Sequence, residues 1–206
     1  MWRQRAIRLL VGSTLMAFVA AGAIVVAQSP LAVDSGVVTI AGTSNIHDWT
    51  ASTTKVRVTR ARLAPLAPGA NIWDIALKPG AIEAFEIAIP AATLASPKGD
   101  LDKNMLKALK VAEFPDITFK LLRFETKADA AGGTRAIGTL KIAGVEKEVA
   151  LLITTKRVGA TLGVHGTVDL LMTDYGIAAP KALMGMLKTD PKVTVTFETV
   201  LAIPLT

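Results

Sequence analysis

Apolar and polar residues alternate along most of the chain after residue 35. A repeat of two residues is typical of β-strands that bury one face. Turn-forming pairs such as Ala143-Gly144 and Gly159-Ala160 separate several of the alternating stretches. The pattern predicts about eight antiparallel strands, near residues 38–40, 55–59, 85–89, 117–124, 137–142, 149–153, 162–170 and 193–197.

One of these stretches changes its alternation part-way. Ile117, Phe119 and Leu121 share one parity, whereas Leu122 and Phe124 take the other. One extra residue in a strand produces this change and bends the strand. The sequence therefore predicts a β-bulge near residues 121–122.

Two segments depart from the strand pattern. Residues 101–111 have helical periodicity, with Asp100 as the expected N-cap and Pro115 as the expected stop. A shorter helical turn is expected at residues 182–187, before the last strand. The apolar side of the longer helix is expected to close one end of the sheet, and it carries Met105, Leu106 and Leu109.

The strand count favours an all-β fold that hides the edges of its sheet. A closed antiparallel barrel does this completely, and eight strands leave room inside for side chains or for one small ligand. Ala136, Gly138 and Gly166 lie on the expected inner faces. Such small residues leave space for a ligand, or they only relieve strand curvature without opening a cavity.

The first residues have the composition of a targeting segment. Arg3, Arg5 and Arg8 precede an uncharged apolar run over residues 9–26, and Val25-Val26-Ala27 offers a cleavage site. We expect a signal peptide at 1–27 and one folded domain at 28–206. The alternative is an uncleaved membrane anchor, because eighteen apolar residues are just long enough to span a bilayer, which needs roughly 17–25.

Composition and charge narrow the classes of function. The chain lacks cysteine, which excludes thiol catalysis, disulfides and cysteine-based metal sites. Removal of residues 1–27 lowers the 23 basic residues to 20 against 17 acidic ones, and the net charge from +6 to +3. No basic cluster with interleaved aromatic residues indicates nucleic-acid binding, whereas transient contact with an anionic membrane is left open.

Few residues could support catalysis or metal binding. The two histidines are His47, next to Asp48, and His165, four residues before Asp169 on a predicted strand face that points to solvent. A metal-dependent hydrolase using both histidines and a carboxylate is one hypothesis, although the chain has no tight metal motif and no G-x-S-x-G. We expect instead that residues 45–48 form a turn and that Trp49 packs as a lid.

Several motifs together resemble those of the YceI-like family. They are Asp102-Lys103-Asn104-Met105, Phe114-Pro115-Asp116-Ile117-Thr118-Phe119, residues 138–145 followed by Val149 and Leu151, and Asp174-Tyr175-Gly176-Ile177. Residues 42–49 are similar to the opening of a subgroup of that family. The resemblance covers roughly residues 35–200.

The resemblance implies a lipocalin-like barrel that is periplasmic or secreted and that binds polyisoprenoids, isoprenoid quinones or similar amphiphiles, without catalytic residues or a cofactor. We expect the apolar tail to lie in the barrel, the polar headgroup near its mouth, and Met105, Leu106 and Leu109 at one end. By alternation, the residues expected to line the cavity are Phe85, Ile87, Ile89, Ile117, Phe119, Leu140, Ile142, Val164, Val168, Val195 and Phe197.

A second hypothesis of function also fits the sequence. A barrel whose interior is filled by its own side chains would act as a scaffolding or interaction module of the cell envelope. The sequence leaves the oligomeric state open, a homodimer included.

Overall fold

The computed structural model describes residues 30–126, 133–179, 181–182 and 187–204, so the expected signal peptide lies outside the described residues. In this part of the chain the helical segments are α1 (Gly99–Ala108) and three short 3-10 helices, η1 (Ile72–Asp74), η2 (Ala91–Thr93) and η3 (Met172–Tyr175). The strands are β1 (Ala32–Ser44), β2 (Trp49–Thr53), β3 (Arg57–Leu63), β4 (Ile82–Pro90), β5 (Asp116–Thr126), β6 (Thr134–Ile142), β7 (Val145–Val158), β8 (Thr161–Leu171), β9 (Lys181–Ala182) and β10 (Leu187–Ala202).

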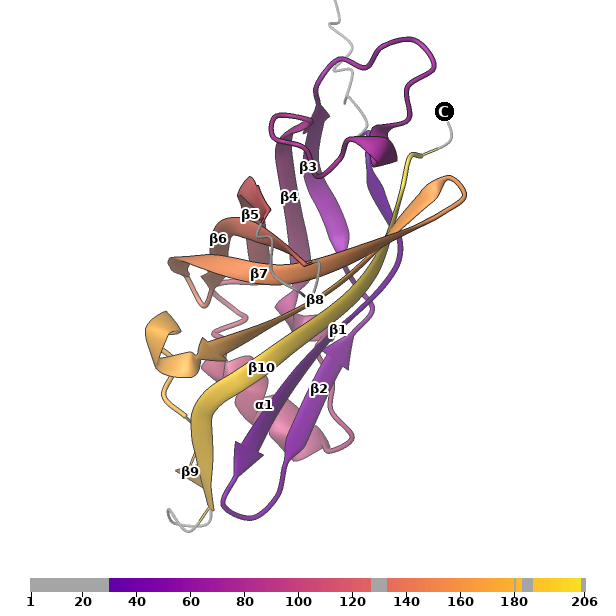
Figure 1. The fold of residues 1–206 in the computed structure, drawn as a ribbon. Coiled ribbons are helices and arrows are strands. Elements are labelled where there is room, and N and C mark those ends of the chain that lie inside the picture. Colours follow the sequence, from indigo (N-terminus) through magenta and orange to yellow (C-terminus); the bar gives the residue numbers. More distant parts are fainter. Residues whose placement is uncertain (1–29, 127–132, 180, 183–186, 205–206) are drawn as a thin grey trace, which may run out of the picture.

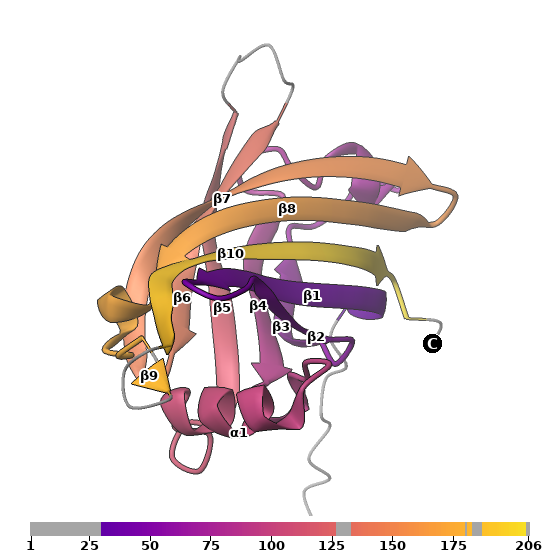
Figure 2. The same ribbon diagram turned by 90° about the horizontal axis from the view of Figure 1, so that it is seen from below.

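The strands form one antiparallel sheet in the order β2-β1-β10-β8-β7-β6-β5-β4-β3, with β9 paired to β10. The sheet curls into a half-barrel, and α1 lies across one of its ends (Figures 1 and 2). This confirms the predicted all-β antiparallel fold. The expected closure is incomplete, because among the described residues no ladder joins β2 to β3; Ser52 of β2 forms an isolated bridge with Ala95 instead.

The described residues form two strands more than the eight predicted. In β2 only Trp49 carried a prediction, as a lid, and the five residues alternate too briefly to signal a strand. Strand β9 overlaps the expected helical turn at 182–187 by one residue, Ala182. That prediction is wrong at its ends, because Ala182 pairs with Leu187 across a β-ladder, and residues 183–186 lie outside the described residues.

The predicted bulge and the predicted hairpin turns are confirmed. The register between β5 and β6 shifts after Leu121: Leu121 pairs with Gly138 and Arg123 with Ile137, so Leu122 has no ladder partner on β6. Ala143 and Gly144 form the two-residue turn between β6 and β7, and both have positive φ, at 49° and 84°. Two successive left-handed residues match the twist of the strands that they join.

Helix α1 differs from the prediction at both ends. It begins after Lys98, and Asp100 lies in its first turn with a fully exposed side chain instead of capping it. The helix ends at Ala108, because Lys110 takes a left-handed conformation with a φ of 53°. The chain therefore leaves the helix several residues before Pro115.

Helices α1 and η1 lie at opposite ends of the half-barrel (Figure 1), and an apolar cluster packs against each of them. One packs α1 and η3 against β1, β8 and β10 through residues such as Met105, Leu109 and Tyr175. The other packs η1 against β8 and β10 through residues such as Ile72, Trp73 and Leu201. Each end of the curled sheet is thus covered by a helical segment of the same chain.

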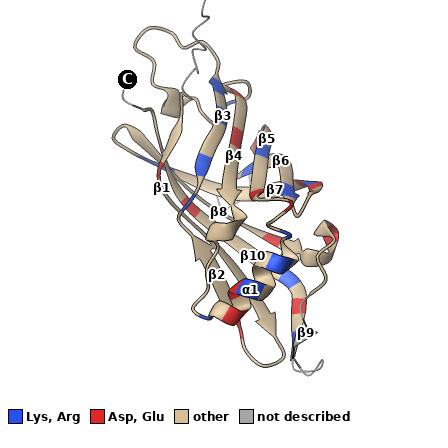
Figure 3. Cartoon of the chain, turned by 180° about the vertical axis from the view of Figure 1, so that it is seen from behind, with Lys and Arg blue, Asp and Glu red and all other residues tan. Residues whose placement is uncertain are grey.

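Charged residues of both signs are interspersed over the strands and α1 (Figure 3). Many form cross-strand ion pairs, for example Arg57 with Asp116 at 2.7 Å and Lys192 with Asp169 at 2.8 Å. Such exposed pairs contribute little to stability individually. Within the described residues, no helix has the length and apolar character needed to cross a membrane.

Candidate ligand-binding cavity

A cavity of about 180 Å³ lies inside the half-barrel, and no charged side chain of the described residues lines it. Its walls come from the inner faces of β1 and of the strands from β4 to β8 and β10, where alternate residues point to the same side. All eleven residues expected from alternation line this cavity, from Phe85 on β4 to Phe197 on β10. That these residues bind a ligand stays a prediction.

Two phenylalanines occupy space that glycines leave on the neighbouring strands. A side chain at Gly138 would overlap the ring of Phe119, and one at Gly166 would overlap the ring of Phe197. Phe197 and Gly166 are direct partners in the β8–β10 ladder. The space over these two inner-face glycines is therefore taken by aromatic rings, which themselves form part of the cavity wall.

Other lining residues were not among the predicted ones. The bulge at Leu122 reverses the alternation, so both Leu121 and Phe124 face the cavity. The change of parity at residues 121–122 of the sequence already indicated that both side chains lie on the same face. Trp73 and Leu77 come from the long connection between β3 and β4, where no periodicity places a side chain relative to the sheet.

A second cavity, of about 100 Å³, lies beside α1. It shares Ile40, Ile117, Ile142, Leu170 and Val195 with the larger cavity, so the two spaces adjoin through the same side chains. Met105 of α1 and Leu109, the residue that follows the helix, both line it. Leu106 is partly buried and lines neither of these cavities, because it is turned about 100° away from Met105 around the helix.

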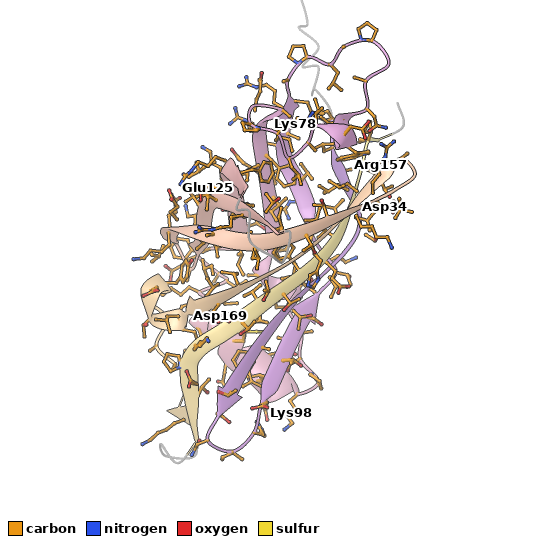
Figure 4. The ribbon with its side chains drawn as sticks, in the orientation of Figure 1. Asp34, Lys78, Lys98, Glu125, Arg157 and Asp169 are labelled. Atoms are coloured by element: carbon orange, nitrogen blue, oxygen red, sulfur yellow. The ribbon has the colours of Figure 1, made fainter. Side chains whose placement is uncertain are left out.

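The opposite end of the large cavity is covered by η1. The Asn71 side chain caps this short helix by accepting a hydrogen bond from the Trp73 backbone N–H at 2.9 Å. The indole Nε1 of Trp73 donates to the carbonyl oxygen of Ala160, in the β7–β8 turn, at 2.8 Å. Asp74 forms an ion pair with Arg157 of the same hairpin, and Figure 4 shows Arg157 at this end of the molecule.

The turn expected at residues 45–48 is present. The Ser44 hydroxyl accepts hydrogen bonds from the backbone N–H groups of Ile46 and His47 and donates to the carbonyl oxygen of His47. Trp49 follows in β2 and packs against the apolar cluster near α1, as the lid expectation requires. His47 itself is exposed, with Nε2 3.2 Å from Nζ of Lys98.

His165 and Asp169 lie on the outer face of β8, as predicted, with about half of each side chain exposed. His165 is 3.5 Å from Glu198, whereas Asp169 accepts hydrogen bonds from Lys192 and Thr194. These hydrogen bonds lower the pKa of Asp169. Within the described ranges, no three histidine, aspartate or glutamate side chains are grouped as metal ligands.

Comparison with known proteins identifies a family that matches this chain. The family model of the YceI-like domain matches residues 70–201, which is more than half of the chain. A search of the curated proteins finds no match to this chain.

The solved structures similar to this fold include two that cover most of the chain. One is BcnA of Burkholderia cenocepacia, at 16% identity and a TM-score of 0.60, over 82% of this chain and 99% of that one. The other is a polyisoprenoid binding domain from Saccharophagus degradans, implicated in plant cell wall breakdown, at 13% identity and a TM-score of 0.60, over 86% of this chain and 100% of that one. The family match and the shared fold together show that the chain belongs to the YceI-like domain family.

Proposed function

We propose that this protein binds a long apolar ligand inside the half-barrel, such as a polyisoprenoid, an isoprenoid quinone or a similar amphiphile. The observation that carries the proposal is the uncharged, almost entirely apolar wall of the 180 Å³ cavity. Membership of the YceI-like family and the similarity in fold to the polyisoprenoid binding domain of Saccharophagus degradans support it.

The driving force is the removal of apolar surface from water. Each buried CH₂ group contributes about 0.8 kcal/mol before the cost of ordering the chain. An engineered cavity of about 150 Å³ with aliphatic and aromatic walls stays dry and binds benzene. The larger cavity here is of that order, and the adjoining cavity beside α1 extends the apolar path for a longer chain.

The same wall favours binding over catalysis. Acid–base and nucleophilic catalysis need titratable or polar groups next to the reacting atoms. The polar side chains among the lining residues are Thr155, Thr199 and Trp73, and the indole N–H of Trp73 is already bonded to Ala160.

We also propose that the chain acts outside the cytoplasm, in the periplasm or after secretion. The basic start, the apolar run over 9–26 and the Val25-Val26-Ala27 site support cleavage after Ala27. The test is the mass of the protein recovered from the periplasm of a bacterial host. A mature protein that begins at Gln28 supports the proposal, and an intact chain in the membrane fraction contradicts it.

A pair of leucine substitutions tests ligand binding. Leu140 lines the cavity, whereas Leu152, on the neighbouring strand β7, is 44% exposed and does not. We expect Leu140→Asp to abolish uptake of farnesol, an isoprenoid alcohol, or to unfold the protein, because it buries a charge in an apolar wall. Leu152→Asp should fold and bind as the wild type does.

A milder variant covers the outcome in which Leu140→Asp does not fold. Val195→Thr keeps the side-chain shape and adds one hydroxyl to the cavity wall. We expect it to fold and to bind farnesol several-fold more weakly. Unchanged farnesol binding by folded Leu140→Asp or by Val195→Thr would contradict this site. Failure of the wild type to bind any apolar probe would favour the filled-barrel scaffolding module.

A further inference from the structure

Two buried polar atoms near α1 have no hydrogen-bond partner among the described residues. They are the indole Nε1 of Trp49 and the hydroxyl oxygen of Tyr175. Tyr175 is only 2% exposed, and although Trp49 is partly exposed, its indole nitrogen is covered. Most buried polar groups in proteins have a partner, so two unpaired atoms in one region need an explanation.

Both residues line the same space, the cavity of about 100 Å³ beside α1. Among the described residues, the other polar side chains that line it are Thr189 and the thioethers of methionine, and no charged side chain does so. A single water molecule needs only about 10–15 Å³ of such space, so the cavity has room for a small functional group.

The fold holds both side chains in place. Trp49 is the ladder partner of Gly42, and its ring occupies the space that a side chain at Gly42 would fill. Tyr175 ends η3, where Gly176 takes a left-handed conformation with a φ of 65° and Ile177 donates a backbone hydrogen bond to Met172. The unpaired atoms therefore belong to anchored residues on two separate elements.

We propose that the cavity beside α1 receives a neutral, oxygen-bearing end of the ligand, and that Trp49 Nε1 and the Tyr175 hydroxyl donate hydrogen bonds to that oxygen. The proposal rests on the proposed function and adds a polar subsite to it. An indole N–H can only donate, and a phenol can donate, so the ligand must supply an acceptor such as a carbonyl or hydroxyl oxygen.

The same residues argue against a charged group at this position. A phosphate in this cavity would lose its water and would meet no cationic side chain among the described lining residues, which is strongly unfavourable. Burial, with a smaller contribution from Asp174, raises the pKa of Tyr175 to about 12, so the hydroxyl keeps its proton at neutral pH and remains a donor.

This arrangement orients the ligand. The oxygen-bearing end lies beside α1, and the chain passes between the side chains shared by the two cavities, toward Trp73 at the far end. A phosphorylated ligand would have to keep its charged group outside the half-barrel. The subsite therefore selects for amphiphiles with a neutral oxygen group, which differs from a polar headgroup held only at the mouth.

Three probes with equal numbers of carbon atoms test the subsite: tridecane, methyl undecyl ketone and tridecyl phosphate. Dissociation constants are measured by equilibrium dialysis for the wild type, Tyr175→Phe, Trp49→Phe and the control Thr167→Val, which changes an exposed hydroxyl on β8. We expect Tyr175→Phe and Trp49→Phe each to weaken ketone binding by roughly three- to tenfold, the usual effect of one hydrogen bond. Tyr175→Phe should change the dissociation constant of tridecane by less than about twofold. In the wild type, the dissociation constants of tridecyl phosphate and tridecane should differ by less than about twofold.

The outcomes separate the two proposals. If the wild type binds no tridecane, the proposed function fails and the subsite fails with it. If Tyr175→Phe leaves ketone binding unchanged, or weakens ketone and tridecane equally, only the subsite is wrong. Urea unfolding of the ligand-free proteins adds a second criterion: Tyr175→Phe should be at least as stable as the wild type, and a clear loss of stability would show that the hydroxyl already has a partner in the protein.

Discussion

Gly166→Ala should shrink the cavity through a side chain on another strand. A methyl group at this position would overlap the ring of Phe197, its partner in the β8–β10 ladder, while the nearest backbone atom, the carbonyl oxygen of Leu152, would be 3.0 Å away. The backbone of Gly166 is not left-handed, so alanine adds no conformational strain. The ring must therefore move, and the free space available to it is the 180 Å³ cavity that it lines.

The size of the effect follows from overpacking. Forcing an extra group into a packed site costs about 1–3 kcal/mol, and urea lowers the unfolding free energy of such a domain by about 2 kcal/mol per molar. Gly166→Ala should therefore lower the urea midpoint by about 0.5–1.5 M, and it should weaken binding of an apolar probe because the ring enters the ligand's space.

Circular dichroism during urea unfolding and dialysis with farnesol measure the two effects. Gly163→Ala is the matched control on the same strand, because its methyl group would meet only the Lys156 carbonyl oxygen, at 3.3 Å. Phe197→Leu in the Gly166→Ala background should restore most of the stability and the binding. A Gly166→Ala protein as stable and as active in binding as Gly163→Ala would refute this reasoning, and so would failure of the smaller residue to rescue it.

Two further predictions concern the ends of the half-barrel. Trp73→Phe removes the hydrogen bond to Ala160 and should lower the free energy of unfolding in urea by about 1 kcal/mol. Asp74→Asn breaks a partly exposed ion pair with Arg157 and should lower it by no more than about 1 kcal/mol. Equal stability of Trp73→Phe and the wild type would contradict the role of Trp73 in holding η1. Tyr175 is the only tyrosine, so tyrosinate absorbance should report a midpoint near pH 12 in the folded protein and near 10 in denaturant. Because the folded pKa is the higher one, the stability from the protonated hydroxyl is complete below pH 10 and is lost as the pH rises through 12; a folded midpoint near 10 would contradict the burial of this group.

Strand parity proved to be the most informative property of the sequence. It places the eleven residues from Phe85 to Phe197 around one cavity, and the change of parity at residues 121–122 correctly marks a bulge. Alternation succeeds here because the sheet is apolar on one face only, so each side chain's direction is fixed by its position in the strand.

The remaining features depend on contacts between distant parts of the chain. Trp73 lines the cavity from a connection without periodicity, held there by Asn71 and by a hydrogen bond to Ala160, 87 residues away. The end of α1 is set by the left-handed Lys110, which has no strong sequence signal for that conformation. The unpaired atoms of Trp49 and Tyr175 become visible only once β2 and η3 are packed against α1.

Organic extraction followed by mass spectrometry tests whether the half-barrel holds an apolar ligand. The protein would be exported in a bacterial host and purified as residues 28–206 without detergent. We expect a long-chain species, in about one copy per protein, that carries a neutral oxygen group. A well-folded protein that yields no such species, and that takes up no farnesol when mixed with it, would contradict ligand binding and favour a filled scaffolding module.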